Sequence, residues 1–234
     1  MEAVERMKAE RVSEAKSQKV ILPYAHDHEF YVEQLGKLPA RWGYRFVKRA
    51  VDIVASLCAL IVFAIPMIII GIAVKLDSDG PVFYRQERLG LNGKPFDCIK
   101  FRSMRVDAER NGAQWSGGDM DPRITKVGRV IRKSRLDELP QFFLTLTGKM
   151  TLVGPRPERE CFYREFEEYI HGFSERLKVK PGFTGLAQVC GGYDLKPEEK
   201  IVYDIAYIKK QSLWLDLKIL LQTVKVVICG EGAK

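Results

Sequence analysis

Two adjacent carboxylates, Asp137 and Glu138, stand in the stretch VGRVIRKSRLDELPQF behind a run of basic side chains. Ser134 precedes them at a position from which it could cap a helix that opens at Arg135 or Leu136. Both acids would then fall in the first helical turn, where free N–H groups and the helix dipole favour negative charge. We therefore expect a depressed carboxylate pKa and an ionised pair. The basic run consists of Arg129, Arg132, Lys133 and Arg135.

An ionised carboxylate among cations can do two kinds of chemistry on phosphorylated substrates. It can attack an electrophilic phosphorus, or it can bind a divalent cation that neutralises a diphosphate. A simpler interpretation stays open, in which helix N-terminal acids pair with surface arginines. Arginine elsewhere suits phosphate, and Pro155 and Pro157 stiffen the backbone around Arg156. The predicted substrate-binding residues are Lys100, Arg102, Arg123, Arg132 and Arg156.

The composition allows one domain plus extensions. The chain has 234 residues, 46% of them hydrophobic, and a net charge of +8. Such a charge favours a polyanionic partner, whether nucleic acid, an anionic membrane face or phosphorylated substrates. The five cysteines are scattered singly, which argues against a disulfide framework or a zinc site and favours a reducing compartment. The sequence HDH from His26 to His28 is interpreted as a solvated polar turn rather than a metal site.

One apolar stretch, residues 53–74, contains no charged side chain and is long enough to span a bilayer. Pro66 lies in its middle, where it removes a helix hydrogen bond and bends the chain. Basic residues flank the stretch on both sides, and such flanks prefer the cytoplasmic side. These features favour a helix that enters the membrane, bends at Pro66 and returns, with a spanning helix as the open alternative.

The elements that must position the acids are predicted from turn signals and periodicity. SDGP and NGKP bracket the strand-like runs VFYRQ and FDCIKF, which predict a β-hairpin. Residues 109–122 read as a polar loop. Helices are expected after the turn at 121–123, over 136–148, over 160–177, and at 197–212 and 213–228. The last helix carries an apolar stripe, which favours core packing, with a membrane surface as the alternative. That stripe consists of Trp214, Leu217, Leu220, Leu221 and Val224.

Several long motifs in one order make the chain similar to the bacterial sugar transferase family, the monotopic phosphoglycosyl transferases. The similarity runs from about Arg45 to Ile228 and rests on FVKRAVD, GPVFYRQERLG, IKFRSM, DPRITKVGRVIRKSRLDELPQ, LVGPRP, VKPGFTGLAQV and LDLKILLQT. The chain looks most like the exopolysaccharide-type branch. It also looks like the small form of the family, since larger members have several spanning helices and a further domain upstream.

The resemblance implies transfer of a sugar 1-phosphate from a UDP-sugar to undecaprenyl phosphate with release of UMP. The family uses Mg²⁺ and an Asp–Glu dyad, which falls here on Asp137 as nucleophile and metal ligand and on Glu138 as its partner. Lys100 and Arg132 would meet phosphates, and Arg156 the nucleotide side of the donor. Glucose, galactose and N-acetylated sugars stay open, with a hexose 1-phosphate slightly favoured.

The resemblance further implies how the segment around Pro66 lies in the membrane. The family's re-entrant helix bends at a Ser-Pro pair, and this pair is Ile65-Pro66 here. The missing hydroxyl leaves the carbonyls freed by the bend without that donor. We therefore expect an α+β fold, namely a mostly helical small catalytic domain with a β-hairpin, anchored by a Pro-bent re-entrant membrane helix and amphipathic surface helices.

The expected divisions are a polar extension at 1–40, the membrane helix at 41–76 and the catalytic domain at 77–234. The protein would be monotopic in the bacterial inner membrane, with the catalytic domain facing the cytoplasm. Its expected partners are the UDP-sugar, undecaprenyl phosphate and membrane lipid, without nucleic acid, and a homo-oligomer is compatible with the sequence. Two rival interpretations are a membrane-tethered anion- or nucleic-acid-binding module, which leaves the acidic dyad unexplained, and a non-catalytic scaffold, which would not need Asp137.

Overall fold

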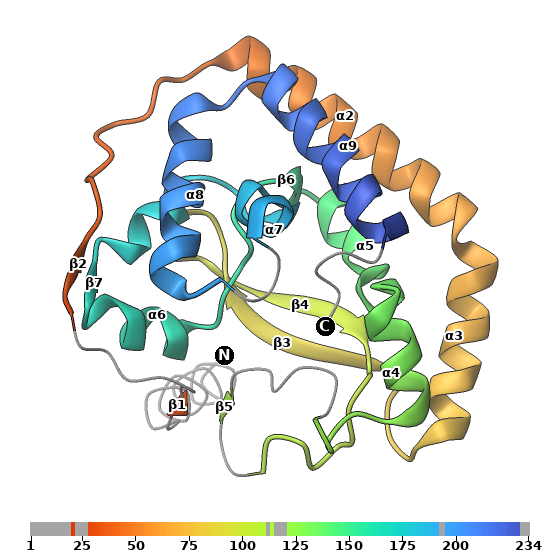
Figure 1. Ribbon diagram of the computed structural model, residues 1–234. Helices are drawn as coiled ribbons and strands as arrows, with labels where there is room; N and C mark the ends of the chain where they lie inside the picture. Colours follow the sequence, from red (N-terminus) through yellow and green to blue (C-terminus); the bar gives the residue numbers. More distant parts are fainter. Residues whose placement is uncertain (1–19, 22–27, 111–112, 115–120, 192–194, 230–234) are drawn as a thin grey trace, which may run out of the picture.

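The computed structural model describes residues 20–21, 28–110, 113–114, 121–191 and 195–229, which form a mostly helical fold with four two-stranded sheets (Figure 1). Most of the predicted polar loop and of the HDH turn lies outside these ranges. The helices are α2 Trp42–Val62, α3 Ala64–Asp77, α4 Lys126–Lys133, α5 Gln141–Leu146, α6 Glu160–Glu167, α7 Leu186–Gly191, α8 Pro197–Lys210 and α9 Leu213–Cys229. The strands are β1 Val20–Ile21, β2 Phe30–Tyr31, β3 Phe83–Leu89, β4 Pro95–Phe101, β5 Ala113–Gln114, β6 Thr151–Val153, β7 Ile170–His171 and β8 Gly182–Thr184.

The apolar segment folds as two helices, α2 and α3, whose axes differ by 61°. Pro66 lies in the first turn of α3, where it offers no N–H to the carbonyl of Val62 and its ring crowds that carbonyl. Helical hydrogen bonding continues on either side, since the N–H of Phe63 donates to Ala59 and that of Met67 donates to Phe63. The predicted proline bend is confirmed, with the break at Phe63. Within the described residues no single helix is long and apolar enough to cross a membrane, whereas the bent pair together meets both requirements.

The N-terminal half of α2 is fixed to α9 by a buried polar cluster. Lys48 Nζ donates to the Asp216 carboxylate (2.7 Å) and to the carbonyl of Val153 (2.9 Å). The hydroxyls of Tyr44 and Tyr207 donate to the same carboxylate, at 2.9 and 2.8 Å. Both oxygens of Asp216 are therefore hydrogen-bonded, and the amphiphilic end of α2 cannot leave α9 without breaking charged contacts.

Two further charged residues of α2 contact the protein interior. Arg49 donates through both terminal nitrogens to carbonyls at the C-terminal end of α5, each at 2.7 Å. Asp52 is 4% exposed and accepts from the Thr151 hydroxyl (2.8 Å) and the Leu152 N–H (2.9 Å) at the start of β6. Lys48, Arg49 and Asp52 thus point inward, while many of the large apolar residues of α2, Phe46 and Ile61 among them, are exposed.

The predicted β-hairpin is confirmed. Strands β3 and β4 pair antiparallel in a register that sets Phe83 opposite Phe101 and Leu89 opposite Pro95 (Figure 1). The connection turns through Asn92 (φ 55°), a residue type that tolerates the left-handed region. Alternate β3 side chains are exposed and partly buried, so one face of the hairpin is available to line an interior space.

The helix predicted over 136–148 is wrong at its start. Residues Leu136–Glu138 form a 3-10 turn, and the α-helix begins only at Gln141. Ser134 does not cap this segment, because Arg135 is the residue that flanks the turn. The Ser134 hydroxyl instead donates to the Val130 carbonyl (2.9 Å) of α4, the helix that ends there. Arg135 then adopts a left-handed conformation (φ 55°), which separates α4 from the turn that carries the two acids.

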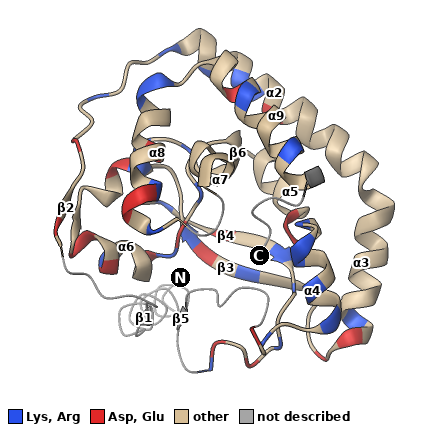
Figure 2. Ribbon diagram, in the orientation of Figure 1, with Lys and Arg blue, Asp and Glu red and all other residues tan. Residues whose placement is uncertain are grey.

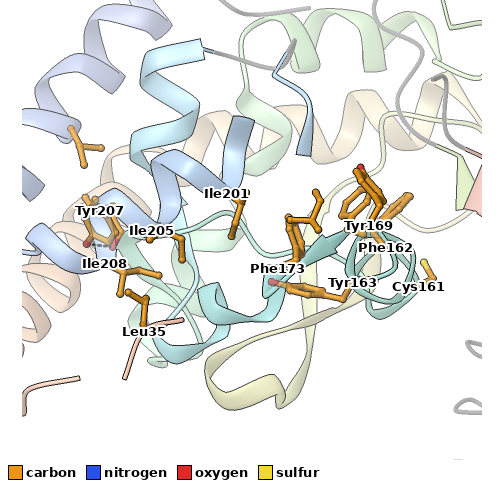
Figure 3. Packing of buried hydrophobic residues seen from close by; sticks show 14 of the residues in the cluster. Leu35, Cys161, Phe162, Tyr163, Tyr169, Phe173, Ile201, Ile205, Tyr207 and Ile208 are labelled. Atoms are coloured by element: carbon orange, nitrogen blue, oxygen red, sulfur yellow. Dashed lines mark hydrogen bonds between the residues drawn. The ribbon is translucent and has the colours of Figure 1, made fainter. Parts of the chain in front are cut away.

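The helix predicted over 160–177 is also shorter than expected. Helix α6 ends at Glu167, strand β7 follows, and a 3-10 helix spans Phe173–Lys178. Gly172 lies between the last two with φ 97°, a conformation that an L side chain disfavours and that ends regular structure. Aromatic residues of this region, Phe166 and Phe173 among them, pack with Ile201 and Ile205 of α8 into the main core (Figure 3).

The two C-terminal helices are confirmed as α8 and α9. On α9, Trp214 is 64% and Leu221 is 62% exposed, and Leu217 and Val224 are exposed as well, whereas Leu220 packs against the core. The favoured interpretation of the apolar stripe as core packing is therefore wrong for most of its members. The prediction of amphipathic surface helices is confirmed by this outward-facing apolar side.

Candidate active site

A cavity of about 1100 Å³ opens beside the hairpin and contains the acidic pair. Figure 2 shows Lys and Arg concentrated on α4, next to the hairpin. Its wall includes Asp137 and Glu138 from the 3-10 turn and the predicted cation Lys100 from β4. The structure therefore brings the acids together with basic residues from several elements. The other predicted binding residues on the wall are Arg102, Arg123, Arg132 and Arg156.

Glu138 is held by one arginine. Arg156 Nη1 donates to Oε2 of Glu138 at 3.4 Å, and Nη2 donates to Oε1 in a shorter contact. Burial acts to raise the pKa of Glu138, but the charge and hydrogen bonds of Arg156 outweigh it and lower that pKa below its usual value. The expectation of a depressed carboxylate pKa is thus right in direction for Glu138.

Asp137 has a different environment. It is 6% exposed and accepts no hydrogen bond from the described residues. Burial, followed by the charge of Glu138, raises the pKa of Asp137 to about 6, against the opposing charges of Lys100 and Arg132. The expected depression is therefore wrong for Asp137. The helix N-terminus that was expected to lower this pKa is replaced by a single 3-10 turn, and the carboxylate is buried beside a second one.

The basic residues around the pair act on different acids. Burial lowers the pKa of Lys100 while Asp137 opposes that shift, and the Lys100 ammonium lies 5.4 Å from the ring of Tyr84. Arg132 acts to lower the pKa of Asp137, and Arg135 acts on that of Glu138. Both arginines line the cavity, Arg132 from α4 and Arg135 from the left-handed position between α4 and the 3-10 turn.

Two of the predicted binding residues use their guanidinium groups on the protein itself. Arg102, 4% exposed, donates to the carbonyls of Asp79 and Ser78, the latter at 2.7 Å, just beyond the end of α3. Arg123 donates to the Asp121 carboxylate, with Nε 2.8 Å from Oδ1. Both still line the cavity, and their part in binding stays a prediction.

Several cavity residues were missed from the sequence. Tyr84, Gln86 and Arg88 share one face of β3, and the period-2 alternation of YRQER could have identified them. Arg176 also lines the cavity, but it lies where the sequence predicted the polar face of a helix. Nothing in that pattern separates a buried arginine from a solvated one.

The donor set fits a magnesium ion held largely by substrate and water. Among the described residues no three His, Cys, Asp or Glu side chains cluster as a protein-only metal site. The carboxylate oxygens of Asp137 accept no hydrogen bond from the part of the chain that the structure describes, while those of Glu138 are bound by Arg156. Mg²⁺ commonly uses one or two carboxylates together with phosphate oxygens and waters, so a single available acid is compatible with it.

Comparison with known proteins points in one direction. Residues 43–230 match the family model described as bacterial sugar transferase. The chain is 41% identical over 227 residues to the UDP-N-acetylgalactosamine-undecaprenyl-phosphate N-acetylgalactosaminephosphotransferase of Aeromonas hydrophila, covering 96% of this chain and 52% of that protein. It is 43% identical over 185 residues to the UDP-glucose:undecaprenyl-phosphate glucose-1-phosphate transferase of Escherichia coli K12, covering 77% and 40%.

A third relative is the undecaprenyl-phosphate galactose phosphotransferase of Salmonella typhimurium, at 39% identity over 226 residues, covering 91% of this chain and 47% of that protein. The chain thus spans about half the length of the curated relatives it matches. The names of these three relatives agree on undecaprenyl phosphate as acceptor and differ in the sugar.

Proposed function

The chain belongs to the bacterial sugar transferase family, and on that premise we propose that it transfers a sugar 1-phosphate from a UDP-sugar to undecaprenyl phosphate, the first membrane step of polysaccharide assembly. The relatives' names describe this reaction with different sugars. The observation that carries the proposal is Asp137, a buried carboxylate that accepts no hydrogen bond from described residues and lies in a cation-lined cavity. An acid kept in this state is unfavourable for stability and suited to chemistry.

The reaction proceeds in two displacements at one phosphorus. An oxygen of the Asp137 carboxylate attacks the β-phosphorus of the UDP-sugar, an O–P bond forms, and the bond to the bridging oxygen breaks so that UMP leaves. An oxygen of the lipid phosphate then attacks the aspartyl phosphosugar, which forms the lipid diphosphosugar and restores the carboxylate. Splitting the transfer lets one cavity serve a water-soluble donor and a lipid acceptor in turn.

The two acids have separate roles. Burial and, after it, the negative charge of Glu138 raise the pKa of Asp137 to about 6, which makes it a more basic nucleophile that is still mostly ionised at neutral pH. Arg156 keeps Glu138 charged and oriented. Lys100, Arg132 and Arg156 stabilise the negative charge of the diphosphate and of the departing UMP.

Asp137 would be the protein ligand of Mg²⁺, which when bound supplies further charge neutralisation at the diphosphate. Because that carboxylate is also the nucleophile, the surrounding cations must orient the donor for in-line attack. Lys100 and Arg132 suit this task, because their charges act directly on Asp137. The nucleotide side of the donor is assigned to Arg156, and Arg102 and Arg123, which line the same cavity, are assigned to donor binding.

We place the bent pair α2–α3 in the bilayer as a re-entrant hairpin, with residues 77–234 as the catalytic domain on the cytoplasmic face of the bacterial inner membrane. The 61° bend and the exposed apolar side chains of both helices support this placement. Cysteine tags near Arg41 and near Asp77 should both be labelled from the cytoplasm. A periplasmic signal from the tag near Arg41 would instead indicate a spanning helix.

UMP release is the direct test of the function. Purified chain in lipid nanodiscs, given Mg²⁺ and undecaprenyl phosphate, should release UMP from one or a few members of a panel containing UDP-glucose, UDP-galactose and their N-acetylated forms. Release should stop with EDTA and in Asp137→Asn. A chain that binds nucleic acid or recruits other enzymes, yet releases no UMP from any member of the panel, would support the binding-module or scaffold alternative.

A further inference from the structure

We propose that Arg176, which lies outside the acidic turn, is a positioning residue that holds Arg156 in place against Glu138. The inference rests on the proposed function and adds to it a residue that touches neither acid. Arg176 Nη2 donates to the backbone carbonyl of Arg156 at 2.8 Å, while the guanidinium of Arg156 binds the Glu138 carboxylate. Arg156 is therefore bound at its backbone by one arginine and at its side chain by one acid.

The loop that carries Arg156 is held through its carbonyls. Pro155 and Pro157 lack an N–H, so the loop itself has few backbone donors. Its hydrogen bonds to the rest of the protein therefore depend on its carbonyls. The N–H of Gly182 donates to the Pro155 carbonyl at 2.8 Å, and Arg88 donates to that of Pro157. With Arg176 on the central residue, three consecutive carbonyls each have a donor, which restricts how far the loop can move.

Only glycine allows the first of these three contacts. A Cβ at position 182 would come within 2.1 Å of the backbone nitrogen of Gly154. The backbone of β8 therefore lies so close to the residue before the Pro155–Pro157 loop that no side chain fits between them. The other two carbonyls of the loop are held by side chains, that of Arg156 by Arg176 and that of Pro157 by Arg88.

Arg176 is itself fixed on three sides. Its Nη2 lies 2.6 Å from Oδ2 of Asp204 on α8, and both side chains are 2% exposed. The guanidinium carbon lies 4.9 Å from the ring centre of Phe173 and 5.9 Å from that of Tyr163. A planar guanidinium can face a carboxylate, a carbonyl and aromatic rings together, which an ammonium cannot. The core cluster shown in Figure 3 thus continues, through Phe173 and Tyr163, to the loop that carries Arg156.

The functional consequence is geometric. A misplacement of about 1 Å in a catalytic group can cost 10²-fold in rate. If Arg176 is lost, the Arg156 carbonyl loses this hydrogen bond and the guanidinium can shift relative to Glu138. The effect of Arg176 on catalysis is then transmitted entirely through Arg156, and this makes a prediction that a general structural role does not make.

The experiment is a mutant cycle measured by kcat/KM for UMP release. Removing one partner of a buried ion pair can prevent folding, so Arg176 and Asp204 are replaced together by Arg176→Met and Asp204→Leu, which preserves a packed interior. This pair variant should lower kcat/KM by roughly 10- to 100-fold, mostly in kcat. In an Arg156→Ala background the same pair should cost less than about 2-fold, because residues that act through one another are not additive.

The matched control removes an ion pair of the same charges from the surface of α6, with Glu160→Gln and Arg164→Gln, and should leave the rate unchanged. Thermal unfolding confirms that each variant is folded. If the Met/Leu pair does not fold, Arg176→Lys replaces it in the same cycle, since a lysine can still neutralise Asp204.

Three outcomes decide the matter. A rate loss that disappears in the Arg156→Ala background supports the inference. A folded variant with the full rate overturns it, and so do losses that multiply with Arg156→Ala, which would mean that Arg176 acts independently, for instance on the substrate. Failure of the proposed function is distinguishable from all of these, because the unmodified chain would then release no UMP.

Discussion

Two clusters of buried charge in this molecule differ in how completely their carboxylates are hydrogen-bonded. Where α2 meets α9, both oxygens of Asp216 accept hydrogen bonds, from Lys48, Tyr44 and Tyr207. In the cavity, Asp137 accepts none from the described residues, although it is as deeply buried as Asp216, at 6% and 7% exposure. Burial alone therefore does not distinguish the two sites, whereas hydrogen bonding does.

This difference in hydrogen bonding indicates a different role for each cluster. A buried carboxylate whose lone pairs are all used contributes to holding two elements together, and removing it leaves a buried cation without a partner. A buried carboxylate with unused lone pairs is unfavourable for stability and has a raised pKa, as reactive groups often do. Mutations at the two clusters should consequently separate stability from turnover.

The largest effect is expected from Asp137→Asn. Removing the nucleophile should lower kcat by at least about 10³-fold. Stability should not fall, because the folded-state pKa of Asp137 lies above its ordinary 3.8, so its ionised form opposes folding at pH values above about 6. Turnover of UDP-sugar and the thermal midpoint at pH 7.5 should be measured on the same preparation. A clear fall in the thermal midpoint alongside the loss of turnover would mean that Asp137 is needed for stability as well.

The cations around the pair come next. Lys100→Ala, Arg132→Ala and Arg156→Ala should each lower kcat/KM by roughly 10²–10³-fold, the cost typical of a lost charge-stabilising contact. Arg135→Ala should cause a loss close to that of Arg132→Ala, because both arginines lie on the cavity wall. A near-normal rate for Arg135→Ala would mean that its side chain takes no part in binding.

The cluster where α2 meets α9, whose carboxylate oxygens are both hydrogen-bonded, should respond in the opposite way. Asp216→Asn leaves the Lys48 ammonium without its carboxylate and should lower the free energy of unfolding by about 3 kcal/mol. The turnover of the folded fraction should stay the same, because Asp216 touches no cavity residue's charged group. Denaturation monitored beside UMP release would check both. A large loss of kcat without loss of stability would erase the distinction between the clusters.

A smaller effect is expected on the pH dependence of the first displacement. Protonation of Asp137 removes the nucleophile, so the single-turnover rate should fall as the pH is lowered through about 6. Glu138→Gln removes the neighbouring negative charge and leaves Arg156 to act on Asp137, and both changes lower the pKa of Asp137. The acidic limb, scaled to the variant's own maximum rate, should move to lower pH. A limb that stays in place would show that Glu138 does not set this pKa.

The sequence predicts the hairpin, the proline bend, the C-terminal helices and the placement of the two acids among basic residues, because turn residues, proline and charge patterns act locally. It fails where tertiary contacts decide. Ser134 was expected to cap the following segment, but it ends α4, and Arg135 is the residue that flanks the turn. The pKa of Asp137 was predicted in the wrong direction because burial depends on the hairpin that covers it. Arg176 was missed because only its packing against Asp204 and Phe173 distinguishes it from a surface arginine.

If Asp137 is the nucleophile, it carries the phosphosugar after the first displacement, and the mass of the intact protein reports that adduct. The chain is incubated with Mg²⁺ and the active UDP-sugar in the absence of lipid, and the added mass is then mapped by peptide analysis. We predict one phosphosugar on Asp137, a smaller amount on the same residue in Glu138→Gln, and none in Asp137→Asn. An adduct that persists in Asp137→Asn or maps to another residue, or UMP release that requires lipid with no adduct at all, would contradict the account.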